Sequence, residues 1–343
     1  MEYRIIDPSA FPSWNDLLAT CRRHSFFHTA EWSQVLSEAY GYRPLYFVSF
    51  RNNAICSLAP LMEVRSLLTG KRAVSLPFTD ECPLVFRDRF GFAAYLKSLQ
   101  DLGKQRGWRY IEWRGGDRYF QGKTPFCRFF IHTLKLRSDE GRMLSGFRSS
   151  TRRNIRKAEK SGVTVEIADT LEAVSAFCRL NRMTRKVHGL PPQPFRFFRL
   201  LHRHVVSRKR GFVALASFQG KPVAASVYLH FGRRAIYKYG ASDRRFQHLR
   251  ANNLVMWEAI RWYTAQGFES FSFGRTAPHN TGLLQFKRGW GVEETSLQYY
   301  RFDLERDAFV QERKKHEFLF EVFNRMPEPM LRLMGMILYR HVA

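Results

Sequence analysis

The chain has few acidic side chains and no long apolar run. Asp and Glu number 30 against 56 Lys and Arg, so the 343 residues carry a formal net charge of +26. Such an excess is typical of proteins that meet nucleic acid, an anionic membrane surface or a phosphorylated substrate, with a solvated basic surface as the alternative. No segment reaches the ~20 apolar residues that span a bilayer, and MEYRIIDPSA lacks signal-peptide features. We therefore expect a cytoplasmic protein.

The cysteines and histidines follow no pattern that holds a metal or a disulfide network. Five cysteines are scattered, and no two of them form a C-x-x-C pair. Eleven histidines are dispersed without the spacing of metal ligands. These patterns disfavour a disulfide framework and a zinc site, and they fit a reducing compartment. We expect no bound metal.

Three familiar catalytic motifs are also missing. The sequence contains no G-x-S-x-G elbow, no G-x-x-x-x-G-K-[ST] phosphate loop and no H-E-x-x-H pair. Their absence disfavours serine hydrolysis, phosphoryl transfer and metal-assisted hydrolysis. The chemistry of this chain must come from a less regular set of residues.

A repeated pattern is the main architectural signal. With 45% hydrophobic and 15% aromatic residues, the chain is globular and long enough for two domains. Residues 95–116 and 255–276 each predict an amphipathic helix, a glycine just past its end and then a strand. Residues 47–61 and 215–229 each predict a β-hairpin with a short polar turn. The order hairpin, helix, strand occurs twice, so we expect two copies of one α/β unit.

A strongly basic segment lies between the two copies. The hydroxyl residues 149–151 are expected to cap a helix that Gly162 ends, before the strand-like VTVEI. The apolar face of this helix is narrow, so most of it faces water or a partner. A second basic cluster, HRHVVSRKR, occupies residues 202–210, and two such clusters favour an anion-binding face over two solvated charge runs. The residues expected to bind tRNA or another anion are Arg152, Arg153, Arg156 and Lys157.

The segment YKYGASDRRFQHLRANN predicts a strand that runs into a helix. Tyr237 and Tyr239 alternate on the strand and are expected to share one face. Asn252 or Asn253 is expected to cap the helix. A helix N-terminus at the end of a strand offers free backbone N–H groups to an anion. This junction is a candidate site for the phosphate of an acyl donor.

These pieces together resemble the Fem family, which are tandem-GNAT-fold transferases that add amino acids from aminoacyl-tRNA to peptidoglycan precursors. They also resemble relatives with a BioF2-like acetyltransferase domain. The matching segments are FHTAEWSQVL, LPFTDECPLVF, FRSSTRRNIRKAEKSGV, YKYGASD, FSFGR and GLLQFKRGWG. The resemblance implies an α/β fold of two tandem GNAT-like domains, each a mixed twisted sheet flanked by helices. We place these domains at residues 1–140 and 141–305, with a C-terminal helical tail at 306–343.

Two departures from the family's pattern bear on the acyl donor. A CoA-dependent enzyme carries Q-x-x-G-x-G at the helix N-terminus, whereas here Arg250 and Asn252 replace both glycines. The Arg250 side chain should crowd a pyrophosphate on the backbone, or else pair with one by charge. The long helical arm of the tRNA-dependent members is also not recognisable. We expect no permanently bound cofactor, and the co-substrate stays open between aminoacyl-tRNA and acyl-CoA.

The stretch GRTAPHNTGLLQFKRGWG, residues 274–291, has four glycines, three cations and no acid. We expect a loop here, and the resemblance implies that Lys287 lies at the reaction centre. A fixed cation beside an acyl ester or thioester stabilises the charge that develops on the carbonyl oxygen. The alternative is that Lys287 is solvated and Phe286 belongs to the core. Asp243 is the second catalytic candidate, as a general base, with His279 and Asp80 as other possible bases. The residues expected to bind substrate are Tyr237, Tyr239, Arg275, Phe286, Asp80, Arg250 and Asn252.

The C-terminal stretch MPEPMLRLMGMILYR predicts a short apolar helix that starts near Pro327 and Pro329. This helix could dock on the body of the protein or lie in the surface of an anionic bilayer.

The sequence thus predicts an acyl or aminoacyl transferase that acts on an amino group of a cell-envelope precursor, of the peptidoglycan or exopolysaccharide type. Its expected partners are a lipid-linked or sugar precursor and tRNA, and an anionic membrane surface, at the inner face of the cell membrane, is a further candidate partner if the tail does not dock on the protein. One alternative is an acyl-CoA-dependent N-acetyltransferase of exopolysaccharide sugars. Another is a non-catalytic basic scaffold that binds RNA or membrane.

Overall fold

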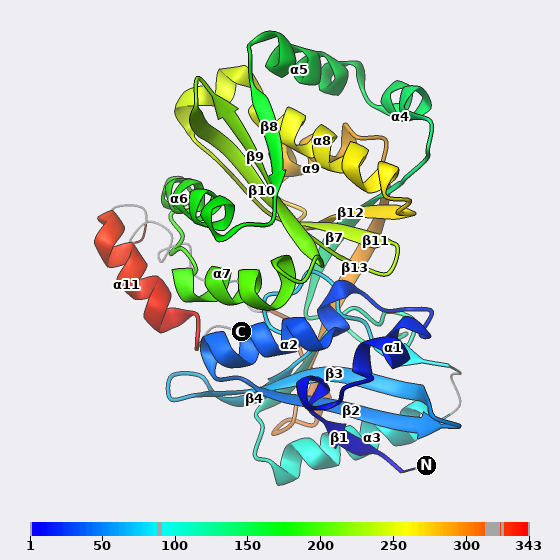
Figure 1. Ribbon diagram of the computed structural model, residues 1–343. Helices are drawn as coiled ribbons and strands as arrows, with labels where there is room; N and C mark the ends of the chain where they lie inside the picture. The colour runs from blue at the N-terminus through cyan, green and yellow to red at the C-terminus, as the bar shows by residue number, and fades with distance from the viewer. Residues whose placement is uncertain (1, 88–90, 313–322, 324–325, 342–343) are drawn as a thin grey trace. The chain divides into compact units, whose positions relative to one another are not determined.

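The computed structural model describes residues 2–87, 91–312, 323 and 326–341 (Figure 1). The chain forms two compact units. The first comprises Met1–Phe129, Ser296–Lys314 and Ile337–Ala343, and the second comprises Phe130–Thr295 and Lys315–Met336. The domain boundaries expected near residues 140 and 305 remain a prediction. Part of the expected helical tail, residues 313–322, lies outside the described residues.

The first unit is built on a sheet with the strand order β1-β2-β3-β4-β6-β13. Neighbouring strands are antiparallel except for β4 and β6, which run parallel. Its elements are β1 (Arg4–Ile6), η1 (Pro8–Ala10), α1 (Trp14–Ala19), η2 (Phe26–His28), α2 (Ala30–Tyr40), β2 (Arg43–Arg51), β3 (Ala54–Ser66), β4 (Gly70–Val74), β5 (Val85–Phe86), α3 (Phe92–Gln105), β6 (Tyr110–Arg114), the second part of β13 (Glu293–Asp303) and β14 (Ala308–Phe309).

The second unit repeats this plan with the strand order β7-β12-β11-β10-β9-β8. Here β11 and β12 form the parallel pair, and the other neighbours are antiparallel. Its elements are β7 (Cys127–Lys135), α4 (Glu140–Gly146), α5 (Ser149–Lys160), β8 (Thr164–Ala168), α6 (Leu171–Val187), α7 (Phe195–Leu201), the π-helical turn η3 (His202–Val206), β9 (Gly211–Phe218), β10 (Lys221–Phe231), β11 (Arg234–Ser242), η4 (Arg244–Leu249), α8 (Ala251–Ala265), β12 (Ser270–Thr276), α9 (Thr281–Arg288) and most of α11 (Glu328–Leu338).

The two expected copies of one α/β unit are confirmed in their local detail. The hairpins β2–β3 and β9–β10 turn through Asn52-Asn53 and Gln219-Gly220, and all four residues have positive φ. Two successive residues with positive φ define the type I′ turn, whose twist matches that of paired strands. The helices α3 and α8 are each followed by a glycine with positive φ before the next strand. The same sequence signals therefore produced the same backbone twice.

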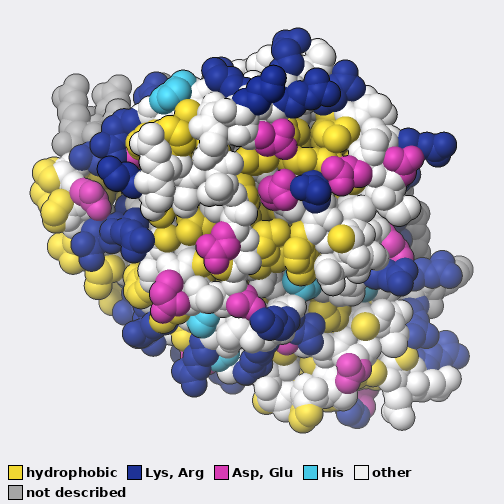
Figure 2. Space-filling view, turned by 45° about the horizontal axis from the view of Figure 1, so that its top comes forward, with side chains coloured by type: hydrophobic (Ala, Val, Ile, Leu, Met, Phe, Trp, Pro, Cys, Tyr) yellow, Lys and Arg dark blue, Asp and Glu magenta, His cyan; other side chains and the backbone are white. Residues whose placement is uncertain are grey.

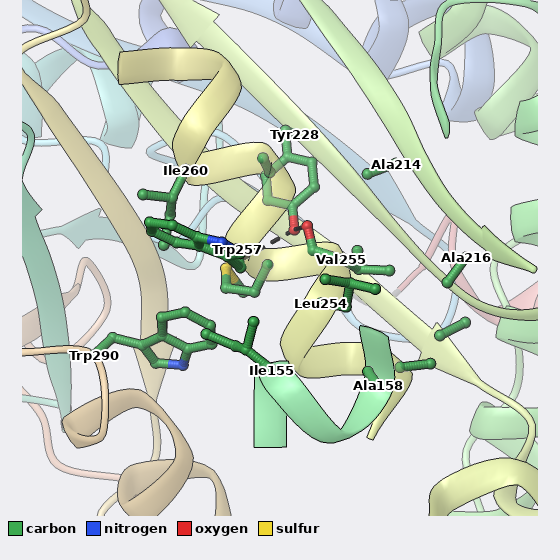
Figure 3. Close-up of a cluster of buried hydrophobic side chains, with 14 of the residues drawn as sticks. Ile155, Ala158, Ala214, Ala216, Tyr228, Leu254, Val255, Trp257, Ile260 and Trp290 are labelled. Atoms are coloured by element: carbon green, nitrogen blue, oxygen red, sulfur yellow. Dashed lines mark hydrogen bonds between the residues drawn. The ribbon is translucent and has the colours of Figure 1, made fainter. Parts of the chain in front are cut away.

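The core of the second unit lies between its sheet and helix α8 (Figure 3). Ala214 and Ala216 of β9 are fully buried, and their small side chains let the helix approach the sheet. On the outer side of α8, Ile155 and Ala158 of α5 pack into the same cluster. Burying these apolar faces fixes α8 between the sheet and the basic helix, which positions the end of β11 and the start of α8.

Two helix boundaries differ from the sequence predictions. Helix α5 begins at Ser149 with Arg148 as its N-cap and no side-chain cap, so the hydroxyl residues lie inside its first turn. The Arg148 N–H donates to the carbonyl of Gly289 at 2.9 Å, so a tertiary hydrogen bond fixes this end. Helix α8 begins at Ala251, one residue before the asparagine expected as its cap. The strand expected at VTVEI is confirmed as β8, and Gly162 has positive φ at the end of α5.

In the first unit, His28 is fully buried and titrates far below the usual range. Its Nε2 lies 2.9 Å from the Pro83 carbonyl, to which it donates, and its Nδ1 accepts from the Ser25 N–H at 3.1 Å. Burial penalises the imidazolium and lowers the pKa of His28 from 6.5 to about 4. The unfolded chain binds the proton first as the pH falls, so the folded unit loses stability between pH 6.5 and pH 4.

We expect His28 to lower the free energy of unfolding by ~3 kcal/mol across that interval. Urea unfolding at pH 7 and pH 4 would measure the change. The variant His28→Gln keeps a donor and an acceptor, and it should unfold with a much weaker pH dependence. His248→Gln, at an exposed position, serves as the control and should behave as wild type. An unchanged pH dependence in His28→Gln would contradict the assignment.

Candidate active site

The parallel strands β11 and β12 separate after a short common stretch. Their pairing runs from Arg234 and Ser270 to Ile236 and Ser272. In the described part of the chain they form no further pairs, although β11 stays paired with β10 as far as Ser242 and β12 stays paired with β7 as far as Thr276. The two strands therefore diverge with their own partners. We call the opening between residues 237–242 and 273–276 the wedge.

A β-bulge at the start of the wedge corrects one sequence prediction. The register of β10 and β11 shifts between Val227 and Tyr228, so that Tyr239 pairs with Val227 and Tyr237 pairs with Tyr228. The extra residue, Lys238, breaks the alternation of faces. Tyr237 packs beside Tyr228 in the core under α8, with ring centroids 5.7 Å apart. Tyr239 instead packs against aromatic side chains of α6 and α7, Phe177, Phe197 and Phe198.

The two tyrosines therefore do not share a face, because a bulge cannot be read from simple alternation. Burial raises the pKa of Tyr237 to about 12, so its hydroxyl stays protonated at neutral pH. A β-carbon on Gly240 would lie 1.8 Å from this hydroxyl, which explains why glycine occupies that position.

The corresponding strands of the first unit are closed over. Strands β4 and β6 pair only at Ala73–Ile111 and Val74–Glu112. Beyond them, Ser75 Oγ accepts from the Arg114 N–H at 3.2 Å, and the Cys82 N–H donates to the Arg114 carbonyl at 2.8 Å. The chain between β4 and β5 thus fills the opening with its own backbone. In the second unit the described pairing of β11 and β12 ends at Ile236 and Ser272, and the wedge lies beyond it.

Part of the stretch 274–291, which was expected to be a loop, forms a helix. Helix α9 covers Thr281–Arg288, and the side chain of Asn280 caps it by accepting from the Leu283 N–H at 3.2 Å. Lys287 is on its inner face and only 2% exposed. Its Nζ donates to the carbonyls of Gly274 at 2.9 Å and Arg275 at 3.2 Å. The ammonium is therefore bound to the part of β12 that has left β11.

Burial of a lysine is unusual and needs such partners. Lys287 supplies donors to two carbonyls at a distorted point of β12, where Gly274 has positive φ and the register with β7 shifts. The alternative that Lys287 is solvated is wrong, because the side chain is buried. The side chain either positions the end of β12 or presents its charge to the wedge, and its catalytic role remains a prediction.

Two glycines of this segment lie close to the junction of α4 and α5. A β-carbon on Gly289 would lie 2.5 Å from Thr151 Oγ1, and one on Gly291 would lie 2.7 Å from the Gly146 carbonyl oxygen. These contacts fasten the end of α9 to the junction of α4 and α5. Close packing therefore accounts for glycine at positions 289 and 291.

A chain of polar side chains that begins at a buried histidine lies beside Lys287 and was not predicted from the sequence. His132 of β7 is completely buried, and its Nε2 donates to Glu294 Oε2 at 2.7 Å. Glu294 also accepts two hydrogen bonds from Arg288, both at 2.7 Å. The Arg288 pair lowers the pKa of Glu294, and burial lowers the pKa of His132, so the pair is a neutral imidazole on a carboxylate. This chain fixes the end of α9 and thereby Lys287.

The junction between β11 and α8 carries a basic rim at the mouth of the wedge. Arg250 is exposed and has φ of 59°, a conformation that costs a non-glycine residue ~1 kcal/mol or more. Asn252 is exposed in the first turn of α8, with its Nδ2 3.2 Å from Ser242 Oγ. Arg244, which the sequence analysis did not single out, is also exposed here. These side chains and the free N–H groups of the helix start offer an anion site.

Asp243 belongs to this junction as a capping residue. Its Oδ1 accepts from the Arg245 N–H at 3.0 Å, and its Oδ2 pairs with Arg245 Nη2 at 2.6 Å. The hydrogen bond from Arg245 lowers the pKa of Asp243, which makes the carboxylate a weak proton acceptor. Its expected role as a general base remains a prediction that this geometry does not favour.

The other predicted residues fall into different surroundings. Phe286 is partly buried, with its ring 5.9 Å from that of Trp290, and it packs on the core of the second unit. Arg275 is partly exposed on β12, next to the distortion at Gly274. Asp80 belongs to the first unit, where its carbonyl accepts from the Tyr299 hydroxyl at 2.6 Å. Arg275 and Lys287 thus lie at the β12 side of the wedge, and Asp243, Arg250 and Asn252 lie at the junction of β11 and α8, whereas Tyr237 and Phe286 pack on the core.

Helix α5 presents the predicted anion-binding residues on its outer side. Arg153, Arg156 and Lys157 are exposed, whereas Arg152 is half-buried and donates to the Ser145 carbonyl at 3.2 Å. Lys and Arg side chains gather along the top of the view in Figure 2, on the side where α5 lies in Figure 1. The narrow apolar face predicted for this helix is confirmed, since Ile155 and Ala158 are its buried apolar residues.

A signal in the sequence could have identified one member of the chain His132, Glu294 and Arg288. Glu294, which follows Glu293 and lies six residues after Arg288, was visible as a possible partner. His132 gave no such signal, because its contact with Glu294 crosses 162 positions of the chain. Among the described residues, no group of His, Cys, Asp and Glu could hold a metal ion. Within the same residues, no helix is both long and apolar enough to cross a membrane.

Comparison with known proteins agrees with this geometry. Residues 145–288, which include the wedge and α9, match the model of the Acetyltransferase (GNAT) domain. The fold is similar to the crystal structure of FemX, with a TM-score of 0.68 and 13% identity over 87% of this chain and 97% of that one. No curated protein sequence matches the chain.

Two further solved structures share the architecture. L-PGS from Bacillus licheniformis has a TM-score of 0.55 and 12% identity, over 97% of this chain and 98% of that one. A tandem GNAT protein from the clavulanic acid biosynthesis pathway has a TM-score of 0.54 and 11% identity, over 88% of this chain and 98% of that one. Identities this low show a shared fold.

Two α/β units of the same topology, one with an open wedge, define a tandem GNAT architecture. Residues 145–288 match the GNAT acetyltransferase domain and the fold is similar to that of FemX, as the sequence motifs predicted, and both findings support an N-acyltransferase. The GNAT fold uses an acyl-CoA co-substrate and implies no permanently bound cofactor.

Proposed function

We propose that the protein transfers an amino acid or a short acyl group to an amino group of a cell-envelope precursor, of the peptidoglycan or exopolysaccharide type. The observation that supports this most directly is the open wedge of the second unit, with Lys287 buried against β12 beside it. The names of the similar structures FemX and L-PGS, and the motifs shared with the Fem family, favour an aminoacyl donor. The acceptor would be a lipid-linked or sugar precursor.

The reaction requires little from the protein beyond placement and charge. The neutral amine attacks the acyl carbonyl carbon, so that a C–N bond forms and the C–O bond to the tRNA ribose breaks. The proton lost by the amine ends on the leaving oxygen, or on sulfur if the donor is a thioester. Lys287 and backbone N–H groups at the wedge would stabilise the charge on the carbonyl oxygen, and water exclusion would strengthen that effect. The acid–base group would be the substrate itself, since Asp243 is held as a weak base.

The basic rim affects which acyl donor the protein can bind. In a CoA-dependent enzyme, glycines let the pyrophosphate rest on the backbone at the helix start. Here Arg250 adopts the left-handed conformation without being glycine, and its side chain stands at that point. Together with the exposed cations of α5, this favours a larger polyanionic donor such as aminoacyl-tRNA. The second candidate is an acyl-CoA-dependent N-acetyltransferase of exopolysaccharide sugars, which the match to an acetyltransferase model favours.

A donor screen tests the proposal. The purified chain would be incubated with lipid-linked precursors and aminosugars, with either charged tRNA or acyl-CoA, and the products analysed by mass spectrometry. We expect an acceptor mass increased by one amino-acid residue with charged tRNA. A product only with acyl-CoA would establish the second candidate. Absence of any acylated product with every donor would contradict both.

Acetyl-CoA is expected to bind only in the millimolar range, near −4 kcal/mol, in titration calorimetry. Crowding by the Arg250 side chain is the reason, so Arg250→Gly should tighten binding by about tenfold or more. Arg244→Gly, at a neighbouring exposed position, is the matched control and should not. If Arg250 pairs with the phosphate instead, Arg250→Gly will weaken binding, and a micromolar complex of the wild type would reverse the donor preference.

The proposed acceptor also suggests where the protein works. A lipid-linked precursor lies in a membrane, so an enzyme at the inner face of the cell membrane would meet it directly. The membrane-facing element proposed from the sequence is the C-terminal helix.

A further inference from the structure

A pocket of about 230 Å³ lies beside the C-terminal helix α11, and one of its lining residues, Phe198, also packs against Tyr239 of the wedge. Its walls come from helix α6, the start of α7 with the segment before it, and α11. Three arginines line it, Arg182, Arg196 and Arg332, together with Asn181. Its apolar lining consists of Cys178, Pro192, Pro194, Phe195, Phe198 and Met336. The pocket therefore combines positive charge with an apolar wall.

Helix α11 is seated firmly enough to form one side of this pocket. Leu331 is 1% exposed, and Gly335 lies so close to the segment before α7 that a β-carbon would be 2.1 Å from the Pro192 carbonyl oxygen. Arg182 of α6 pairs with Glu328 in the first turn of α11, with 3.5 Å between Nε and Oε1. The sequence left open whether the helix docks on the protein, and these contacts show that one of its faces does.

The opposite face of α11 is apolar and open to solvent. Met330, Leu333 and Ile337, spaced three and four residues apart, lie on one side of the helix, and Met336 adjoins them. All four are about half exposed or more. Phe195, at the rim of the pocket, is also 45% exposed. Apolar side chains gather at the left of Figure 2, with Lys and Arg beside them, where α11 lies in Figure 1.

Most of the large exposed apolar side chains are concentrated in these elements. Of the ten in the described residues, seven belong to α6, α7 and α11, namely Met183, Val187, Phe195, Met330, Leu333, Met336 and Ile337. Such a concentration of exposed apolar side chains on a protein of net charge +26 needs an explanation, since repulsion between copies disfavours burial against a second copy. An apolar face bordered by arginines is complementary to the surface of an anionic bilayer.

We propose that the pocket and the exposed face of α11 form a docking site for an anionic phospholipid bilayer, with the lipid headgroup phosphate in the pocket. Arg196 and Arg332 bind the phosphate oxygens, and Phe195 and Met336 contact the start of the acyl chains. Met330, Leu333 and Ile337 insert at the level of the headgroups, with α11 parallel to the membrane plane. Burial raises the pKa of Cys178 to about 12, so its thiol stays neutral as part of the apolar wall.

This site goes beyond the proposed function, because it requires neither an acyl donor nor an acceptor. A lipid-borne acceptor would lie in the same bilayer, which is the only link between the two proposals. Vesicle binding without substrates therefore tests the site alone, and the donor screen with soluble aminosugars tests the transferase alone.

The experiment is co-sedimentation of the full chain with vesicles of phosphatidylcholine alone or with 30% phosphatidylglycerol. We expect binding to the anionic vesicles that persists in part at 0.5 M salt, because the apolar contact is not screened. Met330→Gln with Leu333→Gln should lower the partition coefficient by ~10-fold at both salt concentrations. Arg196→Gln with Arg332→Gln should lower it by about fivefold per arginine at low salt and reduce the preference for phosphatidylglycerol.

Matched variants at other surface positions distinguish binding by this site from a general effect of positive charge or of surface hydrophobicity. Leu67→Gln with Leu68→Gln, in the exposed turn after β3, and Arg152→Gln with Arg153→Gln, on α5, should each change binding less than twofold. Equal losses in the α5 variant would assign binding to diffuse charge and overturn the proposal.

Three other results would also overturn it. The first is no binding to anionic vesicles at low salt. The second is a dimer in solution that Leu333→Gln dissociates, which would assign the face to a second copy. The third is that inorganic phosphate or glycerol phosphate saturates the pocket while the protein has no affinity for vesicles beyond that for the free anion. Circular dichroism confirms that each variant is folded, so that a loss of binding is a loss of contact.

Discussion

Lys287→Met is expected to lower turnover by ~10²–10³-fold if the ammonium stabilises charge in the transition state. Methionine keeps the length and apolar stem of the side chain and removes the cation. The measurement is a pair of rates, at saturating and at limiting acceptor. Lys287→Arg should restore activity only in part, because a planar guanidinium does not fit the site of a point charge between two carbonyls.

The structure adds a second expected result for the same variant. Without the ammonium, the carbonyls of Gly274 and Arg275 lose their donor in a buried setting, which should lower the free energy of unfolding by ~1–3 kcal/mol. The loss of activity therefore has to be separated from a loss of structure. Leu284→Ala, on the buried side of the same helix, gives a destabilised comparison with Lys287 intact.

Gln285→Met, on the exposed side of α9, should leave both activity and stability unchanged. If Leu284→Ala loses as much turnover as Lys287→Met when both are fully folded, Lys287 acts by positioning β12. If only the acceptor KM rises, the side chain grips a distant part of the substrate. Wild-type constants in Lys287→Met would remove this residue from the site.

Reversing the charges of Arg153, Arg156 and Lys157 to glutamate is expected to weaken binding of uncharged tRNA by ~10²–10³-fold at 0.1 M salt. Each phosphate contact adds about 0.9 to the slope of log K against log salt in a duplex, so three lost contacts should lower the slope by roughly 3. The three side chains are exposed on the outer face of α5, and the substitutions leave its packing against α8 intact. Filter binding at several salt concentrations measures both quantities.

The charge-matched control reverses Arg4, Arg23 and Arg51, which are exposed in the first unit. These changes alter the net charge equally, and we expect a much smaller effect on affinity and slope. Comparable losses in both triple variants would mean that tRNA senses only the overall charge. Binding that does not depend on salt would contradict an electrostatic face on α5.

The sequence by itself determined the repeated unit. Two polar turns and two glycines at matching places specified two hairpins and two helix ends, because type I′ turns and left-handed helix ends depend on local backbone preferences. The basic helix α5 and its narrow apolar face were also predictable, since helical periodicity is a local property. The Fem-like motifs led to the fold that the comparisons confirm.

The tertiary structure decided where the predicted residues point. A single bulge at Lys238 put Tyr237 and Tyr239 on opposite faces, and no local signal in the sequence marks a bulge. Lys287 is buried because two carbonyls of a distorted strand accept its hydrogens, and His132 meets Glu294 only through the pairing of distant strands. The wedge stays open in one unit and is closed in the other because the first copy places its own chain there. Such contacts depend on which segments meet in space, so local sequence patterns cannot specify them.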